Sequence, residues 1–150
     1  MSWANLIFGL RGRINRSQFL VGIIAVGVLS QILTIWIMAS LYDQPAHFGY
    51  IAGPQFEAAN AMSGVISLPV LLSLGVRRAH DIGASGWVVF VALVAPLLGA
   101  LPLLFGGAVL WLFALPGALG GLVLLMALGT KGSNRYGDEP APGLSGAWGS

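Results

Sequence analysis

Long apolar segments alternate with short polar ones along the chain. A helix needs about 20 mostly apolar residues to cross a hydrocarbon core of about 30 Å, and several segments reach that length. The pattern therefore predicts an all-α membrane protein with a four-helix transmembrane domain, 19–128. The predicted spans are 19–41, 58–76, 87–104 and 108–128.

The division of the last apolar stretch into two spans follows from its length. No charged residue occurs between Asp81 and Lys131, and one helix over that distance would measure about 70 Å. No bilayer is so thick, so the chain must turn back. Pro102, Gly106 and Gly107 mark the expected turn, which predicts a tight antiparallel hairpin.

Proline and glycine also mark the region between the first two spans. Residues 43–57 are polar and include Pro45, Gly53 and Pro54, which predict an irregular loop. Pro69 lies inside the second span and predicts a kink there.

The two ends of the chain differ in character. Apolar residues from Trp3 to Leu10 recur at helical spacing, which predicts a short amphipathic interfacial helix within segment 1–18. Residues 129–150 are rich in Gly, Pro and Ser. They predict a polar tail that has little to pack.

Composition supports lipid as the solvent of this chain. It is 57% hydrophobic and 8% charged, whereas soluble domains carry about 25% charged residues. The absence of cysteine excludes disulfides and thiolate metal sites. The net charge of +2 comes from few basic residues that flank the spans. That arrangement favours membrane topology and lipid head groups over nucleic acid.

The basic residues also predict the orientation. In the four-span arrangement they all fall on one side, and none falls on the other. By the positive-inside rule that side is cytoplasmic, so both termini, with segments 1–18 and 129–150, are expected in the cytoplasm. The basic residues are Arg11, Arg13, Arg16, Arg77, Arg78, Lys131 and Arg135.

Three polar blocks carry a resemblance to a known family. They read Gly12-Arg-Ile-Asn-Arg-Ser-Gln-Phe19, Arg77-Arg-Ala-His-Asp-Ile-Gly-Ala-Ser-Gly-Trp87 and Gly132-Ser-Asn-Arg-Tyr-Gly-Asp-Glu-Pro140. With the apolar segments between them, they resemble the small bacterial inner-membrane family catalogued as domain-of-unknown-function family 805, the YhaH-like proteins. The resemblance implies a bacterial inner-membrane location and a multi-span fold. It provides no catalytic residue that could be assigned to this chain.

The polar blocks meet on the expected cytoplasmic face and allow two interpretations. Arginines beside Gly-rich backbone could bind a phosphate or lipid head group. The structural interpretation, which we favour, makes Asp81 the hub of a charge network, because a carboxylate at a low-dielectric boundary is costly unless paired. Asp81 is also expected to accept backbone hydrogen bonds where the chain turns into the third span. The candidate anion-binding residues are Arg13, Arg16, Arg77, Arg78 and Arg135. The candidate structural cluster is His80, Asp81, Ser85, Asn134 and Asp138.

Catalysis is not expected from these residues. A metal site needs several ligands, but the only other histidine besides His80 is His47, in the loop on the opposite side. Ser85 with His80 as base has no recognisable oxyanion hole. No charged residue lies within a predicted span, which argues against a proton-coupled pump. Ser63 and Ser67 are interpreted as helix-packing residues.

We therefore expect a non-enzymatic inner-membrane protein that acts by binding. Its expected partners are membrane lipids and another membrane protein or a second copy of itself, as in an accessory subunit. No cofactor, metal or nucleic acid is expected. Two alternatives stay open. One is a small-solute transporter or channel subunit, and the other is an enzyme or binder acting on anionic lipid head groups at the cytoplasmic face.

Overall fold

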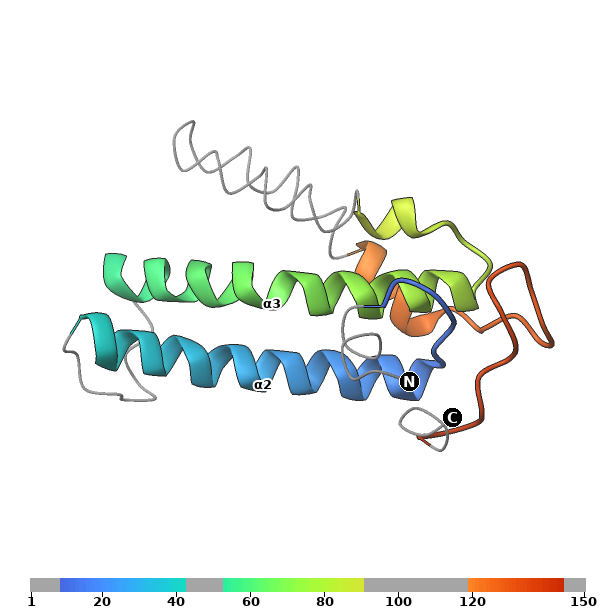
Figure 1. Ribbon diagram of the computed structural model, residues 1–150, viewed down its shortest axis with the longest axis horizontal. Coiled ribbons are helices and arrows are strands. Elements are labelled where there is room, and N and C mark those ends of the chain that lie inside the picture. Colours follow the sequence, from blue (N-terminus) through green and yellow to red (C-terminus); the bar gives the residue numbers. More distant parts are fainter. Residues whose placement is uncertain (1–8, 43–52, 91–118, 145–150) are drawn as a thin grey trace. The chain divides into compact units, whose positions relative to one another are not determined.

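A computed structural model describes residues 9–42, 53–90 and 119–144 (Figure 1). Within these residues the protein is all-helical, as predicted, with one isolated β-bridge and no strand. The long helices are α2, Arg16–Leu41, and α3, Pro54–Asp81. Residues 86–90 and 119–126 are also helical.

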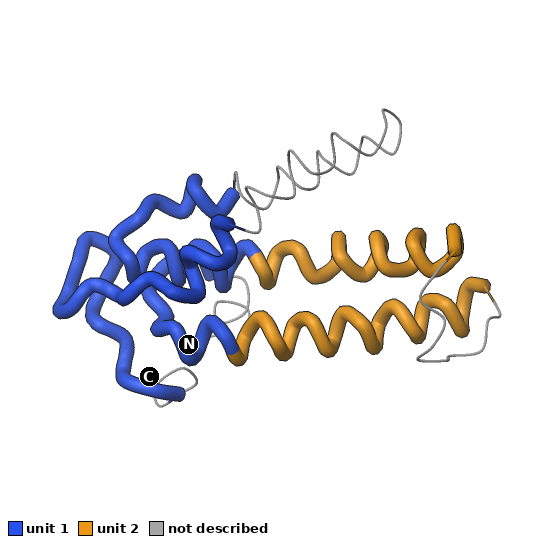
Figure 2. The backbone as a smooth tube through the Cα atoms, turned by 180° about the vertical axis from the view of Figure 1, so that it is seen from behind, with its two compact units in different colours: residues 1–20, 72–150 blue, residues 21–71 orange. Residues whose placement is uncertain are grey.

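The chain divides into two compact units (Figure 2). Unit 1 comprises Met1–Leu20 and Leu72–Ser150, and unit 2 comprises Val21–Leu71. Both long helices contribute to both units, because α2 begins in unit 1 and α3 ends there. Unit 1 holds nearly all of the charged residues, whereas unit 2 holds mainly apolar and hydroxyl side chains.

A capping box sets the start of α2. The side chain of Asn15 accepts a hydrogen bond from the Gln18 amide at 2.9 Å, and the Gln18 side chain accepts one from the Asn15 amide at 3.0 Å. Such reciprocal bonds satisfy donors that have no acceptor in the first turn of a helix. Residues 9–15 are irregular instead, so the predicted interfacial helix does not extend through this part of segment 1–18. Gly12, with φ of 89°, accounts for the turn.

The start of α3 corrects the predicted loop. Pro54 and Glu57 were assigned to the irregular segment 43–57, but the helix begins at Pro54. Proline suits the first helical position, because its fixed φ matches the helix and its missing N–H would lack a partner there. Gly53 precedes it with φ of 117°, and its carbonyl accepts the Glu57 amide at 3.0 Å. The helix then continues through Pro69.

The end of α3 also lies beyond the predicted span, since the helix continues to Asp81. It ends in a Schellman motif, in which Gly83 takes φ of 77°. The Gly83 amide donates to the His80 carbonyl at 3.1 Å, and the Ala84 amide donates to the Ala79 carbonyl at 2.8 Å. Asp81 is therefore a residue of the last helical turn, and its carboxylate accepts hydrogen bonds from arginine side chains, whereas the sequence predicted backbone donors from the turn into the third span.

Unit 2 is a pair of helices joined by hydroxyl groups and a small apolar core. Thr34 and Ser63 are fully buried, and their hydroxyl oxygens lie 2.7 Å apart. The hydroxyl oxygens of Ser67 and Ser30 lie 3.1 Å apart. The packing role predicted for these serines agrees with this geometry. Ile37, Met38 and Ala59 form the buried core beside them, with Leu33, Tyr42 and Phe56 packed against it.

Both long helices leave most of their apolar surface uncovered. Only 11% of the most apolar 18-residue window of α2 is buried, and 22% of that of α3. Each helix is long and apolar enough to cross a membrane, which indicates a membrane protein. Most of the predicted third and fourth spans and their turn, within 91–118, lie outside the described residues.

Candidate functional site

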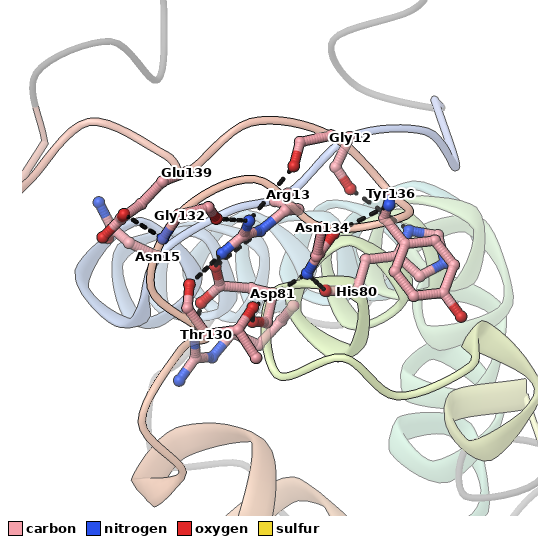
Figure 3. Close-up of polar contacts among 12 residues, drawn as sticks. Gly12, Arg13, Asn15, His80, Asp81, Thr130, Gly132, Asn134, Tyr136 and Glu139 are labelled. Carbon is pink, nitrogen blue, oxygen red and sulfur yellow. Dashed lines mark hydrogen bonds and ion pairs between the residues drawn. The ribbon is translucent and has the colours of Figure 1, made fainter.

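An ion-paired carboxylate lies at the centre of unit 1. Asp81, in the last turn of α3, is 2% exposed. Its Oδ1 accepts hydrogen bonds from Nε and Nη2 of Arg13, at 3.2 and 3.0 Å (Figure 3). Its Oδ2 accepts one from Nη1 of Arg78. The expected pairing of Asp81 with arginines is therefore confirmed, and both guanidinium groups are buried with it.

Different parts of the sequence bring these three residues together. Arg78 precedes Asp81 by three residues in α3, so the two side chains share one helix face. Arg13 comes from the irregular segment before α2, 68 residues away. The Ile14 amide fixes this segment by donating to the Arg77 carbonyl at 3.3 Å. Ser73 adds a hydrogen bond of 2.7 Å to the Gly9 carbonyl.

The two arginines also bind backbone carbonyls of distant segments. Arg13 donates from Nη1 to the Gly132 carbonyl at 2.6 Å and from Nη2 to the Thr130 carbonyl at 2.5 Å. Arg78 donates from Nε to the Leu124 carbonyl at 2.8 Å and from Nη2 to the Ala127 carbonyl. A cation at the last carbonyls of a helix is favourable, so Arg78 caps the helical segment 119–126. One aspartate and two arginines thus join four separate segments.

The start of the tail closes over Asp81. The amide and hydroxyl of Thr130 donate to the Asp81 carbonyl at 2.8 and 2.9 Å. Gly129 lies against the carboxylate so closely that an added Cβ would overlap with it. Only a residue without a side chain fits at that position without displacing the ion pairs.

An aromatic stack covers the neighbouring face of α3. His80 and Tyr136 stack with ring centroids 3.9 Å apart, and the Arg135 guanidinium lies 4.7 Å from the Tyr136 ring centroid. His80 Nδ1 lies 3.3 Å from the Gly12 carbonyl, which can only accept, so Nδ1 is the donor. Burial lowers the pKa of His80. The bond to Gly12 opposes this shift, and the charge of Arg135 adds to it.

Asn134 fastens the tail to α3. Its Nδ2 donates to the His80 carbonyl at 3.0 Å and to the Thr130 hydroxyl at 3.0 Å. Its backbone pairs with Gly137 in both directions at 3.0 Å, which closes a tight turn. The tail segment 130–137 is part of unit 1 and packs against the end of α3, in line with the expectation that the polar blocks meet.

The structure sorts the candidate residues into two groups. His80, Asp81 and Asn134 of the expected cluster come together with Arg13, Arg78 and Arg135. Ser85 instead accepts a bond from the Trp87 amide at 3.4 Å. Asp138 and Arg16 are exposed, and their side chains make no hydrogen bond within the described residues. The backbone carbonyl of Arg77 accepts a hydrogen bond from the Ile14 amide.

The arginines do not act as one group, which changes the anion-binding hypothesis. Arg13 and Arg78 are 7% and 1% exposed, and their donors are used by Asp81 and by carbonyls. The geometry therefore places these two in the structural cluster rather than in a head-group site. A catalytic base at Asp81 is also disfavoured, because both of its oxygens are engaged and buried.

The sequence interpretation missed Gly129 and Thr130, which complete the cluster. Their roles depend on backbone approach and on one hydroxyl, and neither leaves a recognisable pattern of residue types. The one available signal was the position of Gly129 between the last apolar span and the first basic tail residue.

Comparison with protein families places the chain. The family described as "Protein of unknown function (DUF805)" matches residues 7–138, and the protein belongs to this family. The resemblance seen in the three polar blocks is thereby confirmed. Searches of curated proteins and of solved structures gave no match.

Proposed function

We propose that this member of the DUF805 family is a non-enzymatic protein of the bacterial inner membrane that binds another membrane protein through α2 and α3. In this proposal the chain crosses the membrane four times, with both termini and unit 1 at the cytoplasmic side. The distribution of basic residues supports this orientation. A second copy of the chain is the other candidate partner.

The observation that carries the proposal is an exposed amide pair on unit 2. Gln31 of α2 and Asn60 of α3 are exposed and lie 3.5 Å apart between Nε2 and Oδ1. Their neighbours on α2, Val28 and Ile32, are apolar and exposed at 55% and 56%. Amide groups facing hydrocarbon are unfavourable, and polar side chains in spans commonly bond across to another helix. A membrane-embedded partner would satisfy them.

The alternatives have less support from the described residues. A polar pathway would need accessible groups, but Thr34 and Ser63 are fully buried and bonded to each other. Catalysis at the cluster would need a free acid or base, but Asp81 is engaged by two arginines. A binding role needs neither.

Site-specific cross-linking in native membranes tests the proposal. The chain has no cysteine, so Gln31→Cys introduces a single attachment point for a photoactivatable maleimide. We expect a covalent adduct of larger mass after irradiation. Without the photo-reagent, a disulfide-linked dimer after mild oxidation would identify a second copy as the partner.

Val65→Cys is the matched control, because Val65 is 61% exposed on α3 and its neighbourhood is apolar. It should give little defined adduct. The proposal fails if Gln31→Cys gives no intermolecular product, or if both positions react with the same spread of proteins.

A further inference from the structure

A second feature of unit 1 lies beside the ion-paired cluster. It is a cleft of about 670 Å³ between the start of α2, the segment 127–131 and the tail segment 139–143. This volume falls within the range of about 300 to 1,000 Å³ that is usual for small-molecule sites. Arg78 and Asp81 contribute to its lining.

The charge of the cleft is unequal. The lining includes three basic residues, Arg16, Arg78 and Lys131. It includes two acidic residues, Asp81 and Glu139. Arg78 is paired with Asp81, and Glu139 accepts the Gly132 amide at 2.5 Å. Arg13, which is not part of the lining, also pairs with Asp81 and contributes a further positive charge to the region. The region thus holds an excess of positive charge.

Two cationic side chains of the cleft form no hydrogen bond or ion pair within the described residues. These are the side chains of Arg16 and Lys131, which are both exposed. Burial lowers the pKa of Arg78, Asp81 raises it, and the charge of Arg16 lowers it further. Arg16 and Arg78 repel each other because both are positively charged. An anion bound between them would be attracted by both charges.

The apolar part of the lining narrows the choice of anion. Leu128, which is 86% exposed, lines the cleft together with Ala127 and Pro140. The uncharged run of α2 begins at Ser17, directly after Arg16. In a membrane-embedded chain, a cleft at this end of the apolar run lies at the level of the lipid phosphates. The inference therefore rests on the membrane location given in the proposed function.

We infer that this cleft binds the phosphate of an anionic phospholipid through Arg16 and Lys131, with acyl or glycerol carbons against Leu128. The site differs from the paired cluster, whose donors are already occupied. Anionic lipid contributes about 1 kcal/mol per Lys or Arg near the membrane surface, so two cations correspond to roughly a thirtyfold change in affinity.

Native mass spectrometry of the full chain in detergent, titrated with phosphatidylglycerol or phosphatidylcholine, tests this inference. We expect one phosphatidylglycerol molecule to be retained and phosphatidylcholine to be bound much more weakly. The variant Arg16→Gln/Lys131→Gln should lose roughly thirtyfold in affinity for phosphatidylglycerol, while its melting temperature stays close to that of the parent.

The matched control is Arg11→Gln, compared with Arg16→Gln alone, because it removes the same charge at an exposed position outside the cleft lining. It should retain the lipid. Equal loss in both variants would indicate general charge attraction and overturn the site. A third arm adds inorganic phosphate without lipid. If phosphate binds to the parent as tightly as phosphatidylglycerol and the cleft variant loses it, the ligand is free phosphate and the lipid assignment is overturned.

Failure of this inference and failure of the proposed function are separable. Lipid retention is measured on the purified chain, whereas the partner is detected by cross-linking at position 31. A chain that retains phosphatidylglycerol without any cross-linked partner would support the cleft and contradict the partner proposal.

Discussion

Unit 2 joins two helices through hydroxyl groups and apolar side chains, whereas unit 1 joins four segments through one carboxylate and two guanidinium groups. The hydroxyls of unit 2 have alternatives within their own helices. Thr34 donates to the Ser30 carbonyl at 3.0 Å, and Ser67 donates to the Ser63 carbonyl at 2.8 Å. The ion pairs of unit 1 have no such alternative, because a buried arginine without its carboxylate keeps an uncompensated charge.

This difference predicts which substitutions destabilise each unit. Loss of one hydroxyl leaves its partner bonded to a backbone carbonyl, so the cost should be small. Loss of one charge in unit 1 should weaken the attachment of several segments at once. Arg13 and Arg78 also donate hydrogen bonds to carbonyls within residues 124–132, and these bonds depend on the same side-chain positions. We therefore expect polar groups of similar burial to contribute very differently to stability.

The largest effect is expected from Asp81→Asn. The substitution keeps the shape of the side chain but leaves Arg13 and Arg78 buried without a counter-charge, which should cost about 3 to 5 kcal/mol. Thermal unfolding in detergent, followed by tryptophan fluorescence, should give a much lower melting temperature and a lower folded yield. Asp138→Asn is the control, because Asp138 is exposed and makes no hydrogen bond within the described residues.

Charge balance provides a second check on the same cluster. The double variant Asp81→Asn/Arg13→Gln removes one charge of each sign and should recover part of the loss, as expected for directly coupled residues. A fully additive loss, or an Asp81→Asn variant as stable as the control, would contradict the central role given to the carboxylate.

An intermediate effect is expected from Gly129→Ala. The added Cβ overlaps with the carboxylate of Asp81, and such overpacking usually costs about 1 to 3 kcal/mol. Gly121→Ala is the matched control, since Gly121 is helical and an added Cβ meets nothing within 4 Å. The control should be neutral or slightly stabilising. If both variants melt at the same temperature, the close contact of Gly129 with Asp81 is wrong.

The smallest effect is expected in unit 2, from Thr34→Val. The substitution keeps the volume and removes one hydroxyl, while Ser63 keeps its bond to the Asn60 carbonyl at 3.0 Å. Interhelical hydrogen bonds of this kind contribute about 0.6 kcal/mol in membrane proteins. Ser40→Ala, at an exposed position of α2, is the control. A loss as large as that of Asp81→Asn would remove the distinction between the two units.

The sequence alone was enough to predict the two long helices α2 and α3 and the family. The apolar pattern predicted α2 to within a few residues, because burial in lipid and local capping act over short distances. It also determined that Asp81 would be paired, since it is the only acidic residue between Glu57 and Asp138. The ends of α3 were predicted less well, because Pro54 as a first helical residue and Gly83 as a cap are positional effects.

Which arginine pairs with Asp81 and which lines the cleft depends on the fold. Arg13 and Arg16 are three residues apart, yet the turn at Gly12 directs Arg13 to the buried carboxylate, while Arg16 lies in the open cleft. In the tail, the carbonyls of Thr130, Gly132 and Gly137 accept hydrogen bonds from Arg13. Every residue type carries a carbonyl, so these contacts have no signature in sequence and depend on the approach of segments more than a hundred residues apart.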